Sequence, residues 1–206
     1  MQNLTTFLVA AILLTLAPGP DIIFVATKSL AQGARAGVAV ALGLCTGVLF
    51  HVALATAGVS LILRQSPLAF NAVKIAGTLY LLWLAFRAFK HRNDAPASEE
   101  NHAQARARRL ELWKTGAFMS MLNPKVALFF LAFLPQFVPA GTEPAWPRML
   151  LLGAIFDAQA LAVFAVVSVC AGTLFKTLRE RPSIAKILNI TTAIVLVAIA
   201  ASLFFV

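Results

Sequence analysis

The chain alternates long apolar runs with short polar interruptions, and this pattern predicts its class. Six such runs occur, at residues 4–27, 38–63, 67–86, 113–137, 147–174 and 184–206. An α-helix of about 20 apolar residues crosses a hydrocarbon layer of about 30 Å, and each run is long enough to do so. The pattern therefore predicts an all-α integral membrane protein with six transmembrane helices.

The composition agrees with this class. Of the 206 residues, 60% are hydrophobic and 12% are charged, which is too little polarity for the surface of a soluble domain. The net charge of +9 does not indicate nucleic acid, because the cations lie in short loops between apolar runs, as membrane topology signals do. The sequence contains no nucleotide-binding Gly-x-x-x-x-Gly-Lys-Ser/Thr loop and no hydrolase motif. We therefore expect that the chain does not bind ATP through such a loop, is not an enzyme and carries no cofactor.

The positions of lysine and arginine predict the orientation in the membrane. Most of the 17 cations lie in the first, third and fifth connections between the runs. The opposite side carries only Arg64, Lys74 and Arg148. Both termini should therefore lie outside a bacterial inner membrane, with 87–112 as a cytoplasmic linker. A metal site at His91, Glu99, Glu100 and His102 is conceivable, but the mixed charge with Ala, Pro and Ser favours a solvated linker.

The two halves of the chain carry similar motifs in the same order. "GVLFHVALA" from Gly47 resembles "GAIFDAQALA" from Gly153, and "GPD" in the first run has the counterpart "NPK" in the fourth. We therefore expect two three-helix repeats, 1–86 and 113–206, joined by the linker 87–112. Because three is an odd number of spans, the second repeat is inverted in the membrane. Secondary transporters share this arrangement, and their binding sites lie where helices of the two repeats are broken.

The first run is interrupted by Pro18, Gly19, Pro20 and Asp21. A proline lacks an N–H and clashes with the preceding turn, so the helix should break here, and the glycine gives the backbone room to turn. Pro20 suits the first position of a new half-helix, with the carboxylate of Asp21 at the positive end of its dipole. This break is the first part of the predicted substrate site.

The fourth run is interrupted in the same way by Asn123, Pro124 and Lys125. Asparagine is a favoured N-cap, and proline is a favoured first residue of a helix. A lysine inside the membrane is unfavourable by about 2.5–3.5 kcal/mol on insertion scales, so it needs a partner or water. Asp21 at the matching break is the predicted partner. The pair is either the substrate site or an ion pair that only locks the two breaks together.

Further polar residues lie inside two other runs. His51 in the second run can relay protons near neutral pH, or it can be a hydrogen-bonded residue between helices. Asp157, close to Gln159 in the fifth run, is unfavourable in lipid unless it faces a cavity. We expect Asp21, His51 and Asp157 to couple transport to protons.

These motifs resemble one family. "LAPGPDIIFV", "GARAGVAVALGLCTGVLFH", "GTLYLLWLAFRAF" and "NPKVALFFLAFLPQFV" are similar to segments of the LysE/RhtB family of bacterial amino-acid exporters, and the resemblance covers nearly the whole chain. It implies export of amino acids or close analogues across the inner membrane, driven by the proton gradient. It also implies roles for the matching motif positions Asp21, Asn123, Pro124 and Lys125. His51 and Asp157 are more variable positions in the family.

The leading hypothesis is therefore a proton-coupled exporter of small amino acids. Asp21 would hold the ammonium of the substrate, and Lys125 with the N–H groups that open the half-helices would hold its carboxylate. Neutral substrates such as threonine, homoserine or leucine are favoured over lysine and arginine. The expected partners are the amino acid, protons and the lipid bilayer, and the oligomeric state stays open, a homodimer included.

Two alternatives come from other classes. A divalent-metal exporter would use Asp21, His51 and Asp157 as ligands. A membrane thiol–disulfide relay would place a cysteine beside each broken helix, whereas Cys45 and Cys170 lie far from both breaks along the chain.

Overall fold

The computed structural model describes residues 2–17, 19–57, 67–90, 102–130, 134–138 and 144–178, with single positions between 187 and 201. All elements of this part of the chain are helical. They are α1 (Gln2–Leu16), α2 (Pro20–Gln32), α3 (Ala34–Thr56), α5 (Pro67–Lys90), α6 (His102–Met121), α7 (Pro124–Leu128), the 3-10 helix η2 (Leu134–Phe137) and α8 (Trp146–Leu178). The predicted all-α class is confirmed for these residues.

Some of these helices are long and apolar enough to span a membrane. Two of them, α3 and the segment Trp146–Thr173 of α8, are each long and apolar enough without a partner helix. If α1 and α2 are counted as one broken span, they form a third. Together they are long and apolar enough, and they bend by 53° at the break between them. The predicted sixth run, 184–206, lies largely outside the described residues, so the six-span arrangement and the inverted repeat stay predictions.

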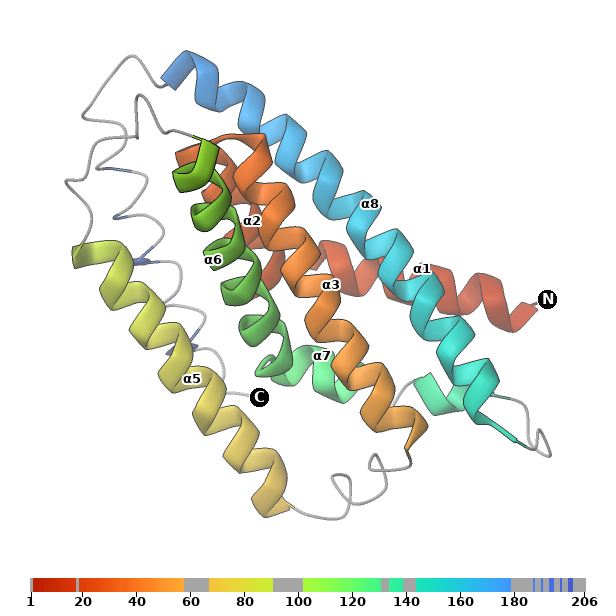
Figure 1. Ribbon diagram of the computed structural model, residues 1–206. Coiled ribbons are helices and arrows are strands. Elements are labelled where there is room, and N and C mark those ends of the chain that lie inside the picture. Colours follow the sequence, from red (N-terminus) through yellow and green to blue (C-terminus); the bar gives the residue numbers. More distant parts are fainter. Residues whose placement is uncertain are drawn as a thin grey trace.

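The helix α3 runs between α6 and α8 and packs against both (Figure 1). Glycines permit the close approach. A Cβ on Gly47 of α3 would lie 2.5 Å from the Cβ of Ser120 on α6, and a Cβ on Gly153 of α8 would lie 2.6 Å from Val52 Cγ2 of α3. Larger side chains at these two positions would push the helices apart, so close backbone approach holds this scaffold together.

An aromatic cluster holds α1 and the segment after α7 against the rest of the bundle. Phe7 of α1 meets Phe137 of η2 edge-on, with 5.2 Å between the ring centroids. Phe156 of α8 lies 5.1 Å from Phe129 and 4.9 Å from Phe130. All five rings are buried, and aromatic pairs at such spacing add about 0.5–1.5 kcal/mol each beyond their apolar burial.

Both predicted helix breaks are present. The helix α2 begins at Pro20 with Gly19 as its N-cap, and α7 begins at Pro124 with Asn123 as its N-cap. Gly19 has φ −164° and ψ 177°, which is extended backbone that any residue adopts. The glycine is therefore not needed for the turn itself, contrary to the role predicted for it.

The stretch 87–112, predicted as a linker, is partly helical. Arg87 lies in the last turn of α5, and α6 begins at His102. Arg87 Nη2 donates to Glu111 Oε1 at 2.7 Å, and this pair joins α5 to α6. Both side chains are largely exposed, and such pairs contribute about 0–1 kcal/mol. The side chains of the conceivable metal site in this stretch lie outside the described residues.

Candidate functional site

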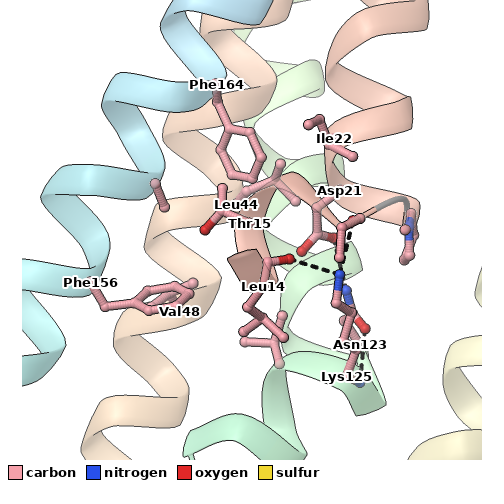
Figure 2. Close-up of a pocket in the computed structure, with 15 residues that line it drawn as sticks. Leu14, Thr15, Asp21, Ile22, Leu44, Val48, Asn123, Lys125, Phe156 and Phe164 are labelled. Atoms are coloured by element: carbon pink, nitrogen blue, oxygen red, sulfur yellow. Dashed lines mark hydrogen bonds between the residues drawn. The ribbon is translucent and has the colours of Figure 1, made fainter. Parts of the chain in front are cut away.

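A small cavity lies where the two helix breaks meet (Figure 2). Five residues of the predicted site line it, namely Gly19, Pro20, Asp21, Asn123 and Lys125. Pro124 is buried at the first position of α7, and Pro18 lies outside the described residues. The cavity has a volume of about 30 Å³, which is room for about two waters. The two breaks therefore form one site with little free space.

Asn123 joins the two breaks through its side-chain amide. Its Oδ1 accepts a hydrogen bond of 3.0 Å from the backbone N–H of Lys125, which is the N-cap bond of α7. Its Nδ2 donates to Asp21 Oδ1 at 3.0 Å. The residue is only 3% exposed, so bulk water does not compete for these bonds. The predicted N-cap is confirmed, and the same residue is the partner of Asp21.

Lys125 does not form the predicted ion pair with Asp21. Its Nζ donates to Leu14 O at 2.8 Å and to Ala17 O at 3.0 Å. Within the described part of the chain, the two charged side chains form no salt bridge with each other. The prediction of a direct pair is wrong because it treated the side chains as isolated charges and left out the carbonyls at the broken end of α1.

The sequence explains why these carbonyls need a partner. In a continuous helix, the N–H of residue 18 would bond to the Leu14 carbonyl, but Pro18 has no N–H. The α-helix ends before Ala17, whose carbonyl is therefore also left without a partner in the helix. A cation near the C-terminal end of a helix bonds to the last carbonyls and is favourable by about 0.3–1 kcal/mol at exposed sites. Lys125 thus caps α1 from the other break.

Gly19 leaves room for this lysine. A Cβ at residue 19 would lie 3.2 Å from Lys125 Nζ and 3.6 Å from its Cδ. The first of these distances is tighter than an ordinary contact. Space beside Lys125, and not backbone flexibility, is therefore what this glycine provides.

Thr15 and Gln159 form a polar contact between α1 and α8 beside the cavity, although no role was predicted for either. Gln159 Nε2 on α8 donates to Thr15 Oγ1 at 2.9 Å, and Thr15 in turn donates to Ala11 O at 2.9 Å. Thr15 lines the cavity. The signal that the sequence offered was a hydroxyl residue in the otherwise apolar stretch 7–16, three residues before Pro18.

The other side of the cavity is apolar. Leu44 and Val48 of α3 and Phe156, Ala160 and Phe164 of α8 form it, and each is at most 5% exposed. The three α8 residues recur at a spacing of four, which places them on one face of the helix. Figure 2 shows the two phenylalanine rings on one side of the cavity and the polar residues of the breaks on the other. A molecule with a charged end and an apolar end would match this division.

His51 and Asp157 do not line the cavity. His51 is 2% exposed, and its Nε2 donates to Ser120 O at 3.0 Å, while its Nδ1 has no hydrogen-bond partner among the described residues. Within the part of the chain that the structure describes, Asp157 Oδ1 is also buried without a partner, and the backbone carbonyl of Asp157 accepts a weak bond of 3.9 Å from the Cys45 thiol. The structure therefore does not bring these two residues to the breaks.

The described residues provide no site for either alternative function. Among them, no group of three His, Cys, Asp or Glu side chains is placed to hold a metal ion. Cys45 is a buried free thiol and Cys170 an exposed one. Neither cysteine lines the cavity at the breaks.

Comparison with known proteins identifies the family. A family model described as LysE type translocator matches residues 12–205, which include both breaks. The chain belongs to the LysE type translocator family. Its resemblance to LysE proteins, predicted from the break motifs, is thereby confirmed, and its apolar helices are those of a membrane transport protein.

Individual relatives of this LysE type translocator are moderately similar. A leucine efflux protein of Klebsiella pneumoniae subsp. pneumoniae is 27% identical over 205 residues, which cover 98% of this chain and 94% of that protein. A homoserine/homoserine lactone efflux protein of Salmonella typhimurium is 33% identical over 147 residues, or 71% of this chain and 69% of that protein. An uncharacterized membrane protein of Vibrio cholerae serotype O1 is 31% identical over 147 residues, or 71% of this chain and 70% of that protein. No solved structure matches the chain.

Proposed function

We propose that this translocator is a secondary active exporter of amino acids or close analogues across a bacterial inner membrane. The observation that carries the proposal is the cavity at the two helix breaks, where Asp21, Asn123 and Lys125 lie opposite an apolar wall. Broken helices with ionisable groups are typical of substrate sites in secondary transporters. Similarity to proteins named for leucine efflux and homoserine efflux supports amino acids as the substrate class.

A zwitterionic amino acid needs both an anionic and a cationic partner. Asp21 lines the cavity, and Asn123 bonds to its Oδ1, so the carboxylate is held where its charge can balance the substrate's ammonium. The first turn of α2, which begins at Pro20, has N–H groups without helical partners, and these favour a carboxylate. Once the ammonium of Lys125 leaves the carbonyls of α1, it can pair with the carboxylate of the substrate.

The lining of this cavity favours neutral substrates over basic ones. The wall formed by α3 and α8 is apolar and suits an aliphatic side chain. A lysine or arginine substrate would bring its side-chain cation, in addition to its ammonium, close to Lys125. Like charges repel strongly where water is excluded. Threonine, homoserine and leucine belong to the favoured class.

Coupling to protons is the second part of the proposal. Asp21 lies in the cavity and can exchange a proton for the substrate's ammonium. His51 Nδ1 and Asp157 Oδ1 are buried without partners among the residues that the structure describes, and such unpaired atoms are rare. Each can therefore accept a proton without breaking an existing bond. In the proposed orientation both termini lie outside, so the linker 87–112 faces the cytoplasm.

A panel of extracellular amino acids tests this function. Cells with and without overexpression of the chain are fed dipeptides, and the amino acids in the medium are compared. Asp21→Asn and Lys125→Ala should each abolish efflux while the protein accumulates normally in the membrane. Lys114→Ala, at an exposed position of α6, is the matched control and should export as the wild type does. Normal export by both site variants contradicts the site, and a medium unchanged by overexpression contradicts the function.

A further inference from the structure

The ammonium of Lys125 already occupies a cation site made of backbone. Its Nζ donates to Leu14 O at 2.8 Å and to Ala17 O at 3.0 Å. Both carbonyls belong to the broken end of α1, and all three residues line the cavity together with Asp21. A cation of the protein itself therefore lies where a substrate's ammonium would enter.

A substrate's ammonium has the same chemistry as the lysine side chain. Both are primary ammonium groups with a single positive charge and three N–H donors. Unwound carbonyls at a broken membrane helix bind cations. Hydrogen bonding to Leu14 O and Ala17 O therefore does not distinguish the amine end of an amino acid from Lys125 Nζ, and the two groups compete for one site.

We propose that the carbonyl pair Leu14 O and Ala17 O is the ammonium subsite of the transporter, and that Lys125 occupies it as an internal substitute when no substrate is bound. The ammonium of the substrate displaces Lys125 Nζ. The released lysine then pairs with the carboxylate of the substrate. This role of Lys125 rests on the proposed function, because the exchange requires a substrate with an amine.

The size of the cavity favours such an exchange. Room for about two waters is too little for an amino acid, so the substrate needs the space at the polar end that Lys125 now fills. The lysine side chain is only partly buried and has a flexible four-carbon stem. Gly19 presents no side chain beside Nζ, so nothing at that position pins the ammonium against α1.

The exchange also keeps the charges in the cavity balanced. Among the side chains that line the cavity, the cation of Lys125 is matched by the carboxylate of Asp21. A bound zwitterion adds one charge of each sign, so two cations then face two carboxylates. Displacement of Lys125 from the carbonyls therefore leaves no unpaired charge in a site with little water.

Binding to the purified full-length protein in detergent tests the exchange. The probes are L-leucine, 3-methylbutylamine, which is leucine without its carboxylate, and 4-methylpentanoate, which lacks the ammonium. Lys125→Met keeps most of the side chain and removes the ammonium. Lys125→Gln retains a neutral donor for the carbonyls and serves as the second variant if Lys125→Met is not recovered folded. Lys114→Met on α6 is the matched control, since residue 114 is exposed and does not line the cavity.

The exchange predicts opposite effects on the two half-ligands. Lys125→Met should bind 3-methylbutylamine at least about tenfold more tightly than the wild type, because the competing charge-assisted hydrogen bonds are gone. Lys125→Gln should show a smaller gain in the same direction. Both variants should bind 4-methylpentanoate more weakly, and Lys114→Met should match the wild type. An affinity for the amine that is unchanged or lower in both Lys125 variants overturns the exchange and identifies Lys125 as a fixed cap.

The panel of extracellular amino acids distinguishes failure of the exchange from failure of the proposed function. If the wild type exports an amino acid but removal of the Lys125 ammonium does not strengthen amine binding, the exchange is wrong and the proposed function stands. If the wild type exports none of the amino acids, the proposed function is wrong and the exchange falls with it.

Discussion

Asn123 is the most informative residue to perturb, because one side chain makes two separable bonds. Its Oδ1 caps α7 through the N–H of Lys125, and its Nδ2 binds Asp21, each at 3.0 Å. Asn123→Ala removes both bonds. Asn123→Ser keeps a hydroxyl oxygen for the cap but is too short to reach Asp21. Comparison of the two variants therefore separates the cap from the contact between the breaks.

The expected magnitudes follow from the two bonds. Loss of an N-cap costs about 0.5–2 kcal/mol, typically about 1. A hydrogen bond to a charged group contributes about 1.5–3 kcal/mol. The free energy of unfolding should therefore fall by about 1.5–3 kcal/mol in Asn123→Ser and by about 2–5 kcal/mol in Asn123→Ala. A double-mutant cycle with Asp21→Ala should give a coupling energy of about 1.5–3 kcal/mol between the two residues.

The free energy of unfolding is measured by denaturant titration in mixed micelles, with helix content from circular dichroism as the readout. Asn71→Ala is the matched control, because residue 71 is an exposed asparagine on α5, and it should stay within about 0.5 kcal/mol of the wild type. Equal losses in Asn123→Ser and Asn123→Ala would refute the separate cap bond. A coupling energy near zero with Asp21→Ala would refute the hydrogen bond that joins the two breaks.

Three further predictions address the space beside Lys125, the backbone and the orientation. Gly19→Ala should lower the rate of efflux several-fold, because the new Cβ would lie 3.2 Å from Lys125 Nζ; an export rate equal to that of the wild type would show that this space does not matter. Gly33→Ala should lower the free energy of unfolding by about 1–3 kcal/mol in the same titration, because residue 33 has φ 88° and ψ 165°, a region open essentially to glycine alone; an unchanged midpoint would contradict this. A reporter that is active only in the periplasm should stay inactive when fused after Asn93, and activity there would reverse the predicted orientation.

The helix breaks could be predicted from the sequence because they depend on local chemistry. A proline in the interior of a helix lacks the N–H and breaks or kinks the helix, whereas Asn-Pro is a favoured way to begin one. The N-cap at Asn123 and the start of α2 at Pro20 follow from these rules. The start of α6 at His102 could not be predicted in this way, because its first turns are polar and carry no apolar period to mark them.

The partner of Lys125 was beyond a prediction based on charge alone. That reasoning pairs Lys125 with Asp21, since each needs an opposite charge in the membrane. In the structure Asn123 binds Asp21, and Lys125 binds the carbonyls of α1. The missing N–H of Pro18 pointed to Leu14 O as an acceptor in need of a donor. Which donor reaches it depends on how the two breaks pack in space, and neither motif contains that information.

A bound molecule could replace the contacts at the two helix breaks, but it could not replace the contacts between α3 and α6. Where α3 meets α6 at Gly47, the helices touch through close backbone approach, and separating them would leave a void that nothing fills. At the breaks, the bonds of Lys125 and Asn123 lie beside the cavity, and an ammonium or a carboxylate can take the place of each partner. The proposed zwitterionic substrate would therefore loosen the breaks without a net loss of hydrogen bonds, whereas no substrate group substitutes for a glycine contact. Opening of the cavity should consequently move the broken ends of α1 and α2 and leave the pairing of α3 with α6 unchanged.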